Sequence, residues 1–278
     1  MRWPLPALIM LTAAVCSAVI LPVSQAHSSQ VVRAGISSVV AQAYGKAIVR
    51  QYETITGFKA QTFVGPSHVA IDRLMNDVAD IAITELGASN EMKKKGYVEI
   101  PFCRDPLVII TNNRFSKDMP GSIENLGTEQ LRMIFGGDIT NWKDVGGPDQ
   151  TIVLVVPGEK TGAFTNFSRQ VMNSKKMRYD YVTYHAIESI KGVQYIPGAI
   201  SFVAQGAIEN TDAIKVINVD GLSPKEKSYP LYQTFYFLTK GEPKGPAKAA
   251  INFGLSRWGV EIMQSRGMQP ILGAFPGR

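Results

Sequence analysis

The residues best placed for chemistry in this sequence are hydroxyls and glycines that follow short apolar runs. Thr161 and Gly162 come after the apolar run 152–157 and before a helical pattern that begins near Phe164. This order predicts a strand, a tight loop and the first turn of a helix. The first turn offers unpaired backbone N–H groups and the positive end of the helix dipole, so it can hold an anion. Lys160 would add a cation beside it.

Serine hydroxyls occupy two earlier turns of the same kind. The predicted strand 31–35 leads to Ser37 and Ser38, and the predicted strand 58–64 leads to a turn that contains Ser67. A serine at such a position can cap the helix, contact a ligand, or do both. Repeated strand–turn–helix units predict parallel strands joined by helical crossovers, with ligands at the carboxyl ends of the strands.

Thr84 and Glu85 end a third apolar run, 80–83. An acidic side chain that faces an oxyanion is favourable only if the ligand has a proton to donate, because two unprotonated anions repel each other in a water-poor cleft. Glu85 could therefore select protonated ligands, or it could be a solvated carboxylate at a strand end. The sequence leaves both interpretations open.

Cys103 and Arg104 lie inside the long apolar run 99–112. A cysteine in a buried strand usually serves packing, which is one interpretation. The other is a soft ligand for a metalloid, since the charge of Arg104 would favour the thiolate. The sequence leaves this choice open as well, and it predicts no other metal ligand.

Composition and length narrow the classes of protein. The chain has 278 residues, of which 45% are hydrophobic, enough for two modest cores. Its formal charge is +6, but Lys and Arg are scattered and their one tight run is 93–95, so no nucleic-acid partner is expected. Three scattered histidines and the lack of nucleophile or carboxylate motifs predict no zinc site, no cofactor and no enzyme.

The first 26 residues have the features of a secretory signal peptide. Arg2 gives a basic start, an apolar run follows, and Ser24-Gln25-Ala26 offers small residues for cleavage before His27. A periplasmic protein is therefore expected, and removal of this segment would leave Cys103 as its only cysteine.

The segment 134–147 reads IFGGDITNWKDVGG, and it resembles the signature of phosphate-type periplasmic solute-binding proteins of ABC transporters. The likeness continues through 197–200, 229–231, 238–241 and 255–259. It implies an α/β fold of the type II, two-lobe class, in which each lobe is a mainly parallel sheet flanked by helices. Two crossing strands, at 99–112 and 229–239, would form the hinge. The expected lobes are 27–108 plus 228–278, and 109–227.

The resemblance also concerns the ligand-binding loops. The Ser37–Ser38 turn is similar to the first anion-holding loop of the family. In the second loop, 157–163, this sequence lacks the arginine found in close relatives, and Ala163 replaces a hydroxyl residue. The candidate ligand-binding residues are Ser37, Ser38, Ser67, Thr84, Glu85, Cys103, Arg104, Lys160, Thr161 and Gly162.

Two functions fit these residues. The first is capture of a small inorganic anion, phosphate by default, and its delivery to an ABC permease by a monomeric protein. The second is a periplasmic sensor that binds a metalloid such as arsenite through Cys103 and signals to a sensor histidine kinase.

Overall fold

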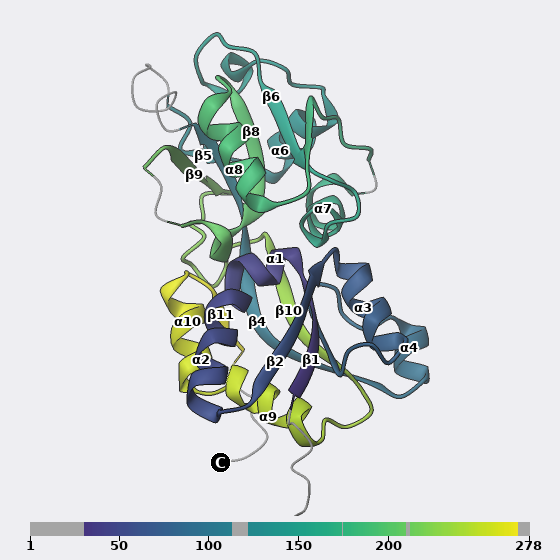
Figure 1. Ribbon diagram of the computed structural model, residues 1–278. Coiled ribbons are helices and arrows are strands. Elements are labelled where there is room, and N and C mark those ends of the chain that lie inside the picture. Colours follow the sequence, from purple (N-terminus) through teal and green to yellow (C-terminus); the bar gives the residue numbers. More distant parts are fainter. Residues whose placement is uncertain (1–30, 113–121, 174, 210–211, 272–278) are drawn as a thin grey trace, which may run out of the picture.

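The computed structural model describes residues 31–112, 122–173, 175–209 and 212–271, and these form two α/β lobes joined by a long strand (Figure 1). The segment 1–26, expected to be a signal peptide, lies outside the described residues. Within the described ranges, no helix combines the length and the apolar character needed to span a membrane.

The lower lobe in Figure 1 contains both ends of the described chain. Its parallel strands are β1 (Val31–Ser37), β2 (Lys59–Gly65) and β3 (Ile81–Thr84), with β1 in the middle. Next to β3 runs the antiparallel strand β10 (Tyr232–Lys240). Helical segments cover this sheet: α1 (Ser38–Val40), η1 (Ala41–Gly45), α2 (Lys46–Thr56), α3 (Ser67–Met75), α4 (Asn90–Lys94), α9 (Gly245–Gly254) and α10 (Arg257–Ser265). The short strand β11 (Gln269–Pro270) pairs with β4.

The upper lobe repeats the pattern. Its parallel strands are β8 (Ala199–Ala204), β6 (Val153–Pro157) and β7 (Tyr181–Thr183). The strands β9 (Ile214–Val219) and β5 (Asn125–Leu126) pair with each other. Its helical segments are α6 (Thr128–Gly136), η2 (Trp142–Val145), α7 (Gly162–Phe167), η3 (Ser168–Met172), α8 (Ala186–Tyr195) and η4 (Gln205–Ala207). The predicted two-lobe class is confirmed.

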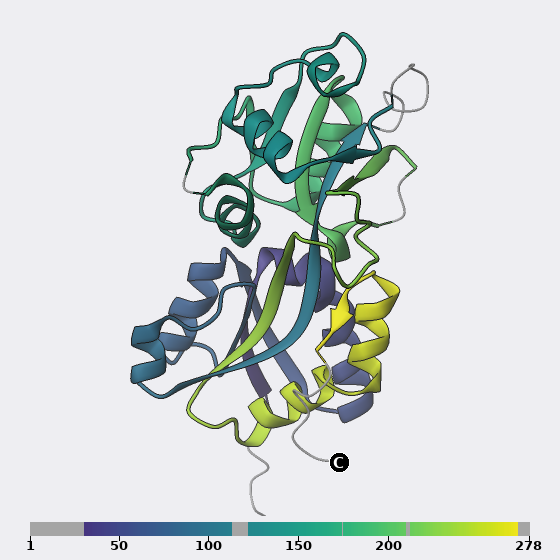
Figure 2. The ribbon, with the colours of Figure 1, turned by 180° about the vertical axis from the view of Figure 1, so that it is seen from behind.

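The strand β4 (Tyr97–Asn112) belongs to both lobes. Its first part pairs with β10, from Tyr97 opposite Lys240 to Pro106 opposite Tyr232. Its second part pairs with β8 in the upper lobe. A second crossing precedes β10, because Leu231 packs in the upper core while β10 itself lies in the lower lobe (Figure 2). Both predicted crossings are therefore present.

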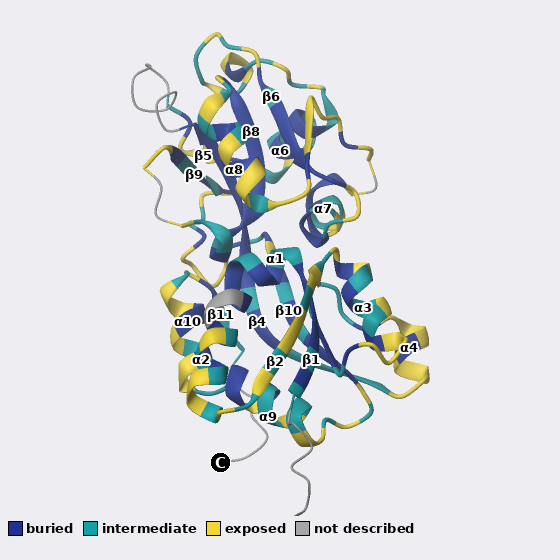
Figure 3. Ribbon diagram, in the orientation of Figure 1, coloured by how far each residue is buried: buried dark blue, intermediate teal, exposed yellow. Residues whose placement is uncertain are grey.

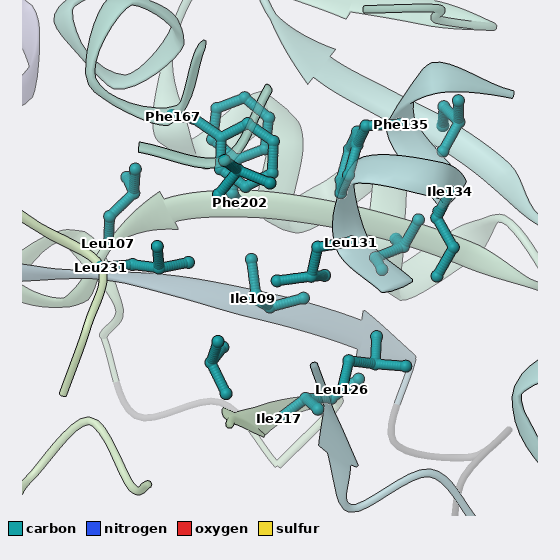
Figure 4. Packing of buried hydrophobic residues seen from close by; sticks show 14 of the residues in the cluster. Leu107, Ile109, Leu126, Leu131, Ile134, Phe135, Phe167, Phe202, Ile217 and Leu231 are labelled. Carbon is teal, nitrogen blue, oxygen red and sulfur yellow. The ribbon is translucent and has the colours of Figure 1, made fainter. Parts of the chain in front are cut away.

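Buried residues follow the central strands of both lobes (Figure 3), and each lobe has a hydrophobic core that contains aromatic residues. In the upper lobe, the rings of Phe167 and Phe202 stack with centroids 3.9 Å apart, and Phe135 packs edge-on against them (Figure 4). In the lower lobe, Phe102 stacks on Phe237 with centroids 4.2 Å apart. Burying a side chain of this size stabilises a fold by about 1.5–3 kcal/mol.

The C-terminal helices differ from what the sequence predicts. The apolar residues Ile251, Phe253, Leu255 and Trp258 predict one amphipathic helix over 246–263, but the structure has two, α9 and α10, separated at Leu255 and Ser256. The Gly254 carbonyl accepts a hydrogen bond from the Tyr44 hydroxyl at 2.7 Å. The hydroxyl thus satisfies a carbonyl at the end of α9, where helix carbonyls have no intrahelical partner.

Candidate ligand-binding site

A cavity of about 330 Å³ lies between the lobes, where strand-to-helix turns from both of them meet. The lower lobe lines it with residues of three turns: Ser38, Val39, Val64, Gly65, Pro66, Ser67 and Glu85. The upper lobe adds Lys160, Thr161, Tyr184 and His185. The predicted convergence of strand ends therefore occurs, and it joins residues that are far apart in the chain, such as Ser38 and Lys160.

Glu85 is the most buried charged group of this cavity, with 3% of its surface exposed. Its Oε1 accepts a hydrogen bond from the Ser67 hydroxyl at 2.5 Å, and its Oε2 accepts one from the Ser37 hydroxyl. Ser37 also caps α1, since its Oγ accepts the Val40 N–H at 3.2 Å. One carboxylate thus gathers the hydroxyls of two different turns.

The same carboxylate lies against the upper lobe. A Cβ atom added to Gly162 would lie 1.9 Å from Glu85 Oε1, so only a glycine fits at the start of α7 in this arrangement. Thr161 caps α7 by accepting the Phe164 N–H at 3.2 Å, and its hydroxyl donates to the Gly158 carbonyl at 2.8 Å. Lys160 is exposed at the cavity wall.

Thr84 has a different role from the one expected. It is fully buried, and its Oγ1 accepts the Leu86 N–H at 3.0 Å. It does not belong to the cavity wall. Its hydroxyl instead fixes the turn after β3, which directs Glu85 toward the serines.

Cys103 and Arg104 do not join the site. Cys103 is fully buried among the apolar residues of the lower core. Burial, together with the nearby Asp105, raises the pKa of its thiol, which disfavours the thiolate. The guanidinium of Arg104 lies 3.6 Å from the ring centroid of Tyr232, in a separate small cavity. Neither residue lines the cavity in which they were expected as ligand contacts, and the burial of Cys103 favours packing, the first of its two interpretations.

Two residues of the cavity wall, Tyr184 and His185, were not among the predicted site residues. They precede α8, and the N–H groups of both donate to the Glu188 carboxylate at 2.8 and 3.3 Å. An acidic residue three positions after a helix start was the available signal. The next residue, Ala186, donates its N–H to Gln42 Oε1 across the lobes at 3.0 Å.

A second buried carboxylate, Asp105, lies at the crossing of the lobes. It is fully buried, and it accepts the Gly206 N–H of η4 at 3.0 Å and the Gln233 Nε2 of β10 at 3.3 Å. Burial raises its pKa to about 7, and the two hydrogen bonds partly oppose that rise.

Among the described residues, no group of three or more His, Cys, Asp or Glu could hold a metal ion.

Comparison with known proteins defines the family. The model of the PBP superfamily domain matches residues 23–255. The chain therefore belongs to this superfamily.

Individual relatives agree with this assignment. The phosphate-binding protein PstS of Borreliella burgdorferi is 24% identical over 86% of this chain and 90% of its own length. A solved structure of a putative phosphate ABC transporter substrate-binding protein from Clostridium perfringens, with bound phosphate, has a TM-score of 0.75 at 23% identity. It covers 86% of this chain and 99% of its own. An ABC-type phosphate transport receptor from Vibrio cholerae has a TM-score of 0.66 at 24% identity, with 84% and 98% covered.

Proposed function

We propose that this protein captures a small oxyanion of the phosphate type between its lobes and presents it to an ABC permease in the periplasm, as a monomer. The observation that carries the proposal is the cavity itself. The hydroxyl residues Ser38 and Ser67 of the lower lobe line it, and from the upper lobe so do Lys160 and Thr161, the residue that caps α7. Hydroxyls, helix starts and a cation are groups that bind oxyanions.

The names of the relatives support phosphate as the ligand. The loop 157–163 has no arginine, so a lysine takes the place of a planar fork that could bind two oxygens at once. Because the Cys103 thiol is sealed in the core, capture of arsenite through that residue is not part of the proposal.

A thermal-shift panel tests the proposal. The chain from His27 onward would be melted with phosphate, sulfate, molybdate, arsenate and arsenite. A ligand that binds only the folded state raises the melting temperature, by more the further its concentration exceeds its Kd. We expect phosphate and arsenate to raise it and arsenite to leave it unchanged.

Two lysine variants of the upper lobe localise the effect. Lys160→Gln should weaken phosphate binding by about tenfold, the effect of losing a charge-assisted contact. Lys191→Gln is the matched control, since Lys191 is exposed on α8 and lines a different cavity. No shift with any oxyanion, or an equal loss in both variants, would contradict the proposal.

A further inference from the structure

Two serine hydroxyls already have a partner beside the cavity: Ser67, which lines its wall, and Ser37, which is buried just behind it. The Ser37 and Ser67 hydroxyls both donate to the Glu85 carboxylate, one to each oxygen. Ser37 is fully buried and Ser67 is 2% exposed, so neither has a large open surface for a second acceptor. A hydroxyl has one proton to donate, and here that proton is in use.

The position of the carboxylate matters as much as its bonds. Glu85 extends from the end of β3 to the first turn of α7, where its Oε1 occupies the space that a side chain at residue 162 would need. It thus holds the place between the lower-lobe hydroxyls and the upper-lobe helix start. A negative group at that point accepts the two hydroxyl protons that an oxyanion would seek.

We propose that Glu85 is a tethered occupant of the anion site, which an incoming oxyanion must displace from the Ser37 and Ser67 hydroxyls. This inference rests on the proposed function. The tether keeps the carboxylate at a high effective concentration, and the ligand must also overcome repulsion between two negative charges. Glu85 therefore lowers the affinity for oxyanions and keeps the two hydroxyls oriented while the ligand is absent.

The test compares phosphate Kd values, measured by calorimetry, for the protein and three variants. Glu85→Ala removes the carboxylate, and Glu85→Gln keeps its size without its charge. We expect both to bind phosphate more tightly, by about tenfold or more. Glu159→Gln is the matched control, because Glu159 is an exposed carboxylate that lies one residue from Lys160 and lines a different cavity. Its Kd should stay within about twofold of the parent value.

Acetate gives a readout that does not depend on phosphate. It replaces the atoms that Glu85→Ala removes, so acetate should raise the melting temperature of this variant and compete there with phosphate. It should do neither in the parent protein, whose hydroxyls are occupied. Circular dichroism confirms that each variant is folded before its binding is measured.

The outcomes separate the two proposals. Weaker phosphate binding by Glu85→Ala and Glu85→Gln would overturn the tethered occupant and leave oxyanion capture standing, with Glu85 as a ligand contact. Acetate binding to Glu85→Ala without oxyanion binding to any form would support the occupant and overturn the proposed function. Unchanged phosphate binding without an acetate effect would overturn the occupant alone.

Discussion

At the scale of single residues, Gly162 of the upper lobe lies against the Glu85 side chain of the lower lobe, and there is no room for a side chain at residue 162. The Cβ of an alanine at 162 would overlap the carboxylate, and its neighbours on the lower-lobe side are the two serines that hold it. The end of β3 and the start of α7 can therefore approach each other closely only because residue 162 is a glycine.

We expect Gly162→Ala to lower the free energy of unfolding by about 1–3 kcal/mol, the cost of overpacking. The same change made in Glu85→Ala should cost much less, because the overlapping atoms are gone. Urea unfolding of the two single variants and the double variant measures this coupling. Gly65→Ala is the control, since a Cβ there would lie 3.7 Å from its nearest neighbour. Additive effects of the 85 and 162 changes would contradict the contact.

Some residues of the site could be predicted from the sequence, and others could not. Ser37, Ser67 and Thr161 were identifiable because each follows an apolar run and begins a helix, which is a local pattern. Cys103 and Arg104 were misplaced because both lie within β4, whereas the cavity is lined by the turns at which other strands end. An apolar run does not show how its strand is placed relative to the cleft. The hydrogen bonds from Ser37 and Ser67 to Glu85 join three separate turns, so no local sequence pattern could predict them.

At the scale of elements, Asp105 connects three segments at the hinge: its own strand β4, Gln233 of β10, and Gly206 of η4. The Gln233 Oε1 accepts no hydrogen bond from any described residue. Protonated Asp105 is uncharged and has a proton to donate to such an acceptor. Ionised Asp105 has no proton to donate, and burying its charge is unfavourable.

The raised pKa of Asp105 predicts how stability depends on pH. Because its pKa is about 7 in the folded protein and 3.8 in the reference state, the folded protein binds more protons between these values. The contribution of Asp105 is therefore fully present below pH 3.8, and it is lost as pH rises toward 7.

Asp105→Asn removes this titration and offers an amide proton to Gln233. We expect the stability of the parent protein relative to Asp105→Asn to fall by about 2–3 kcal/mol from pH 5 to pH 8. Urea unfolding at the two pH values gives the difference. The double comparison cancels the titration of other groups, and a difference that does not change with pH would contradict the prediction.

Element boundaries show where local patterns suffice. The strands after Val31 and Phe58 were predictable because apolar alternation and glycine or serine turns mark them. The break between α9 and α10 was not, because the carbonyl at the end of α9 finds its partner in the Tyr44 hydroxyl, 210 positions away in the sequence. Gly206 of η4 packs against Ala43 and Met268 of the lower lobe, and this contact between distant segments could not be predicted from local patterns either.

At the scale of the whole molecule, the two lobes share β4. Phe102 of this strand packs in the lower core, and Ile109 packs in the upper one. Unfolding of either lobe would remove from the other part of a strand that is buried along most of its length. The lobes should therefore unfold together, although each has its own core.

We expect calorimetry to show one transition, with equal calorimetric and van't Hoff enthalpies. Phe102→Ala and Ile109→Ala, one in each core, should each lower the stability by about 2–5 kcal/mol and move the whole transition. Circular dichroism and tryptophan fluorescence should give coincident curves. Two resolved transitions, of which each variant moves only one, would show that the lobes unfold separately.

The seclusion of Cys103 has a practical consequence. Among the described residues it is the lone thiol, and none of its surface is exposed. A cysteine introduced at Tyr184, which is 68% exposed at the cavity rim, would then be the group that a fluorescent maleimide reaches first in a chain beginning at His27. The dye would sit at the mouth of the cleft, and its emission would follow the arrival and departure of solute in real time.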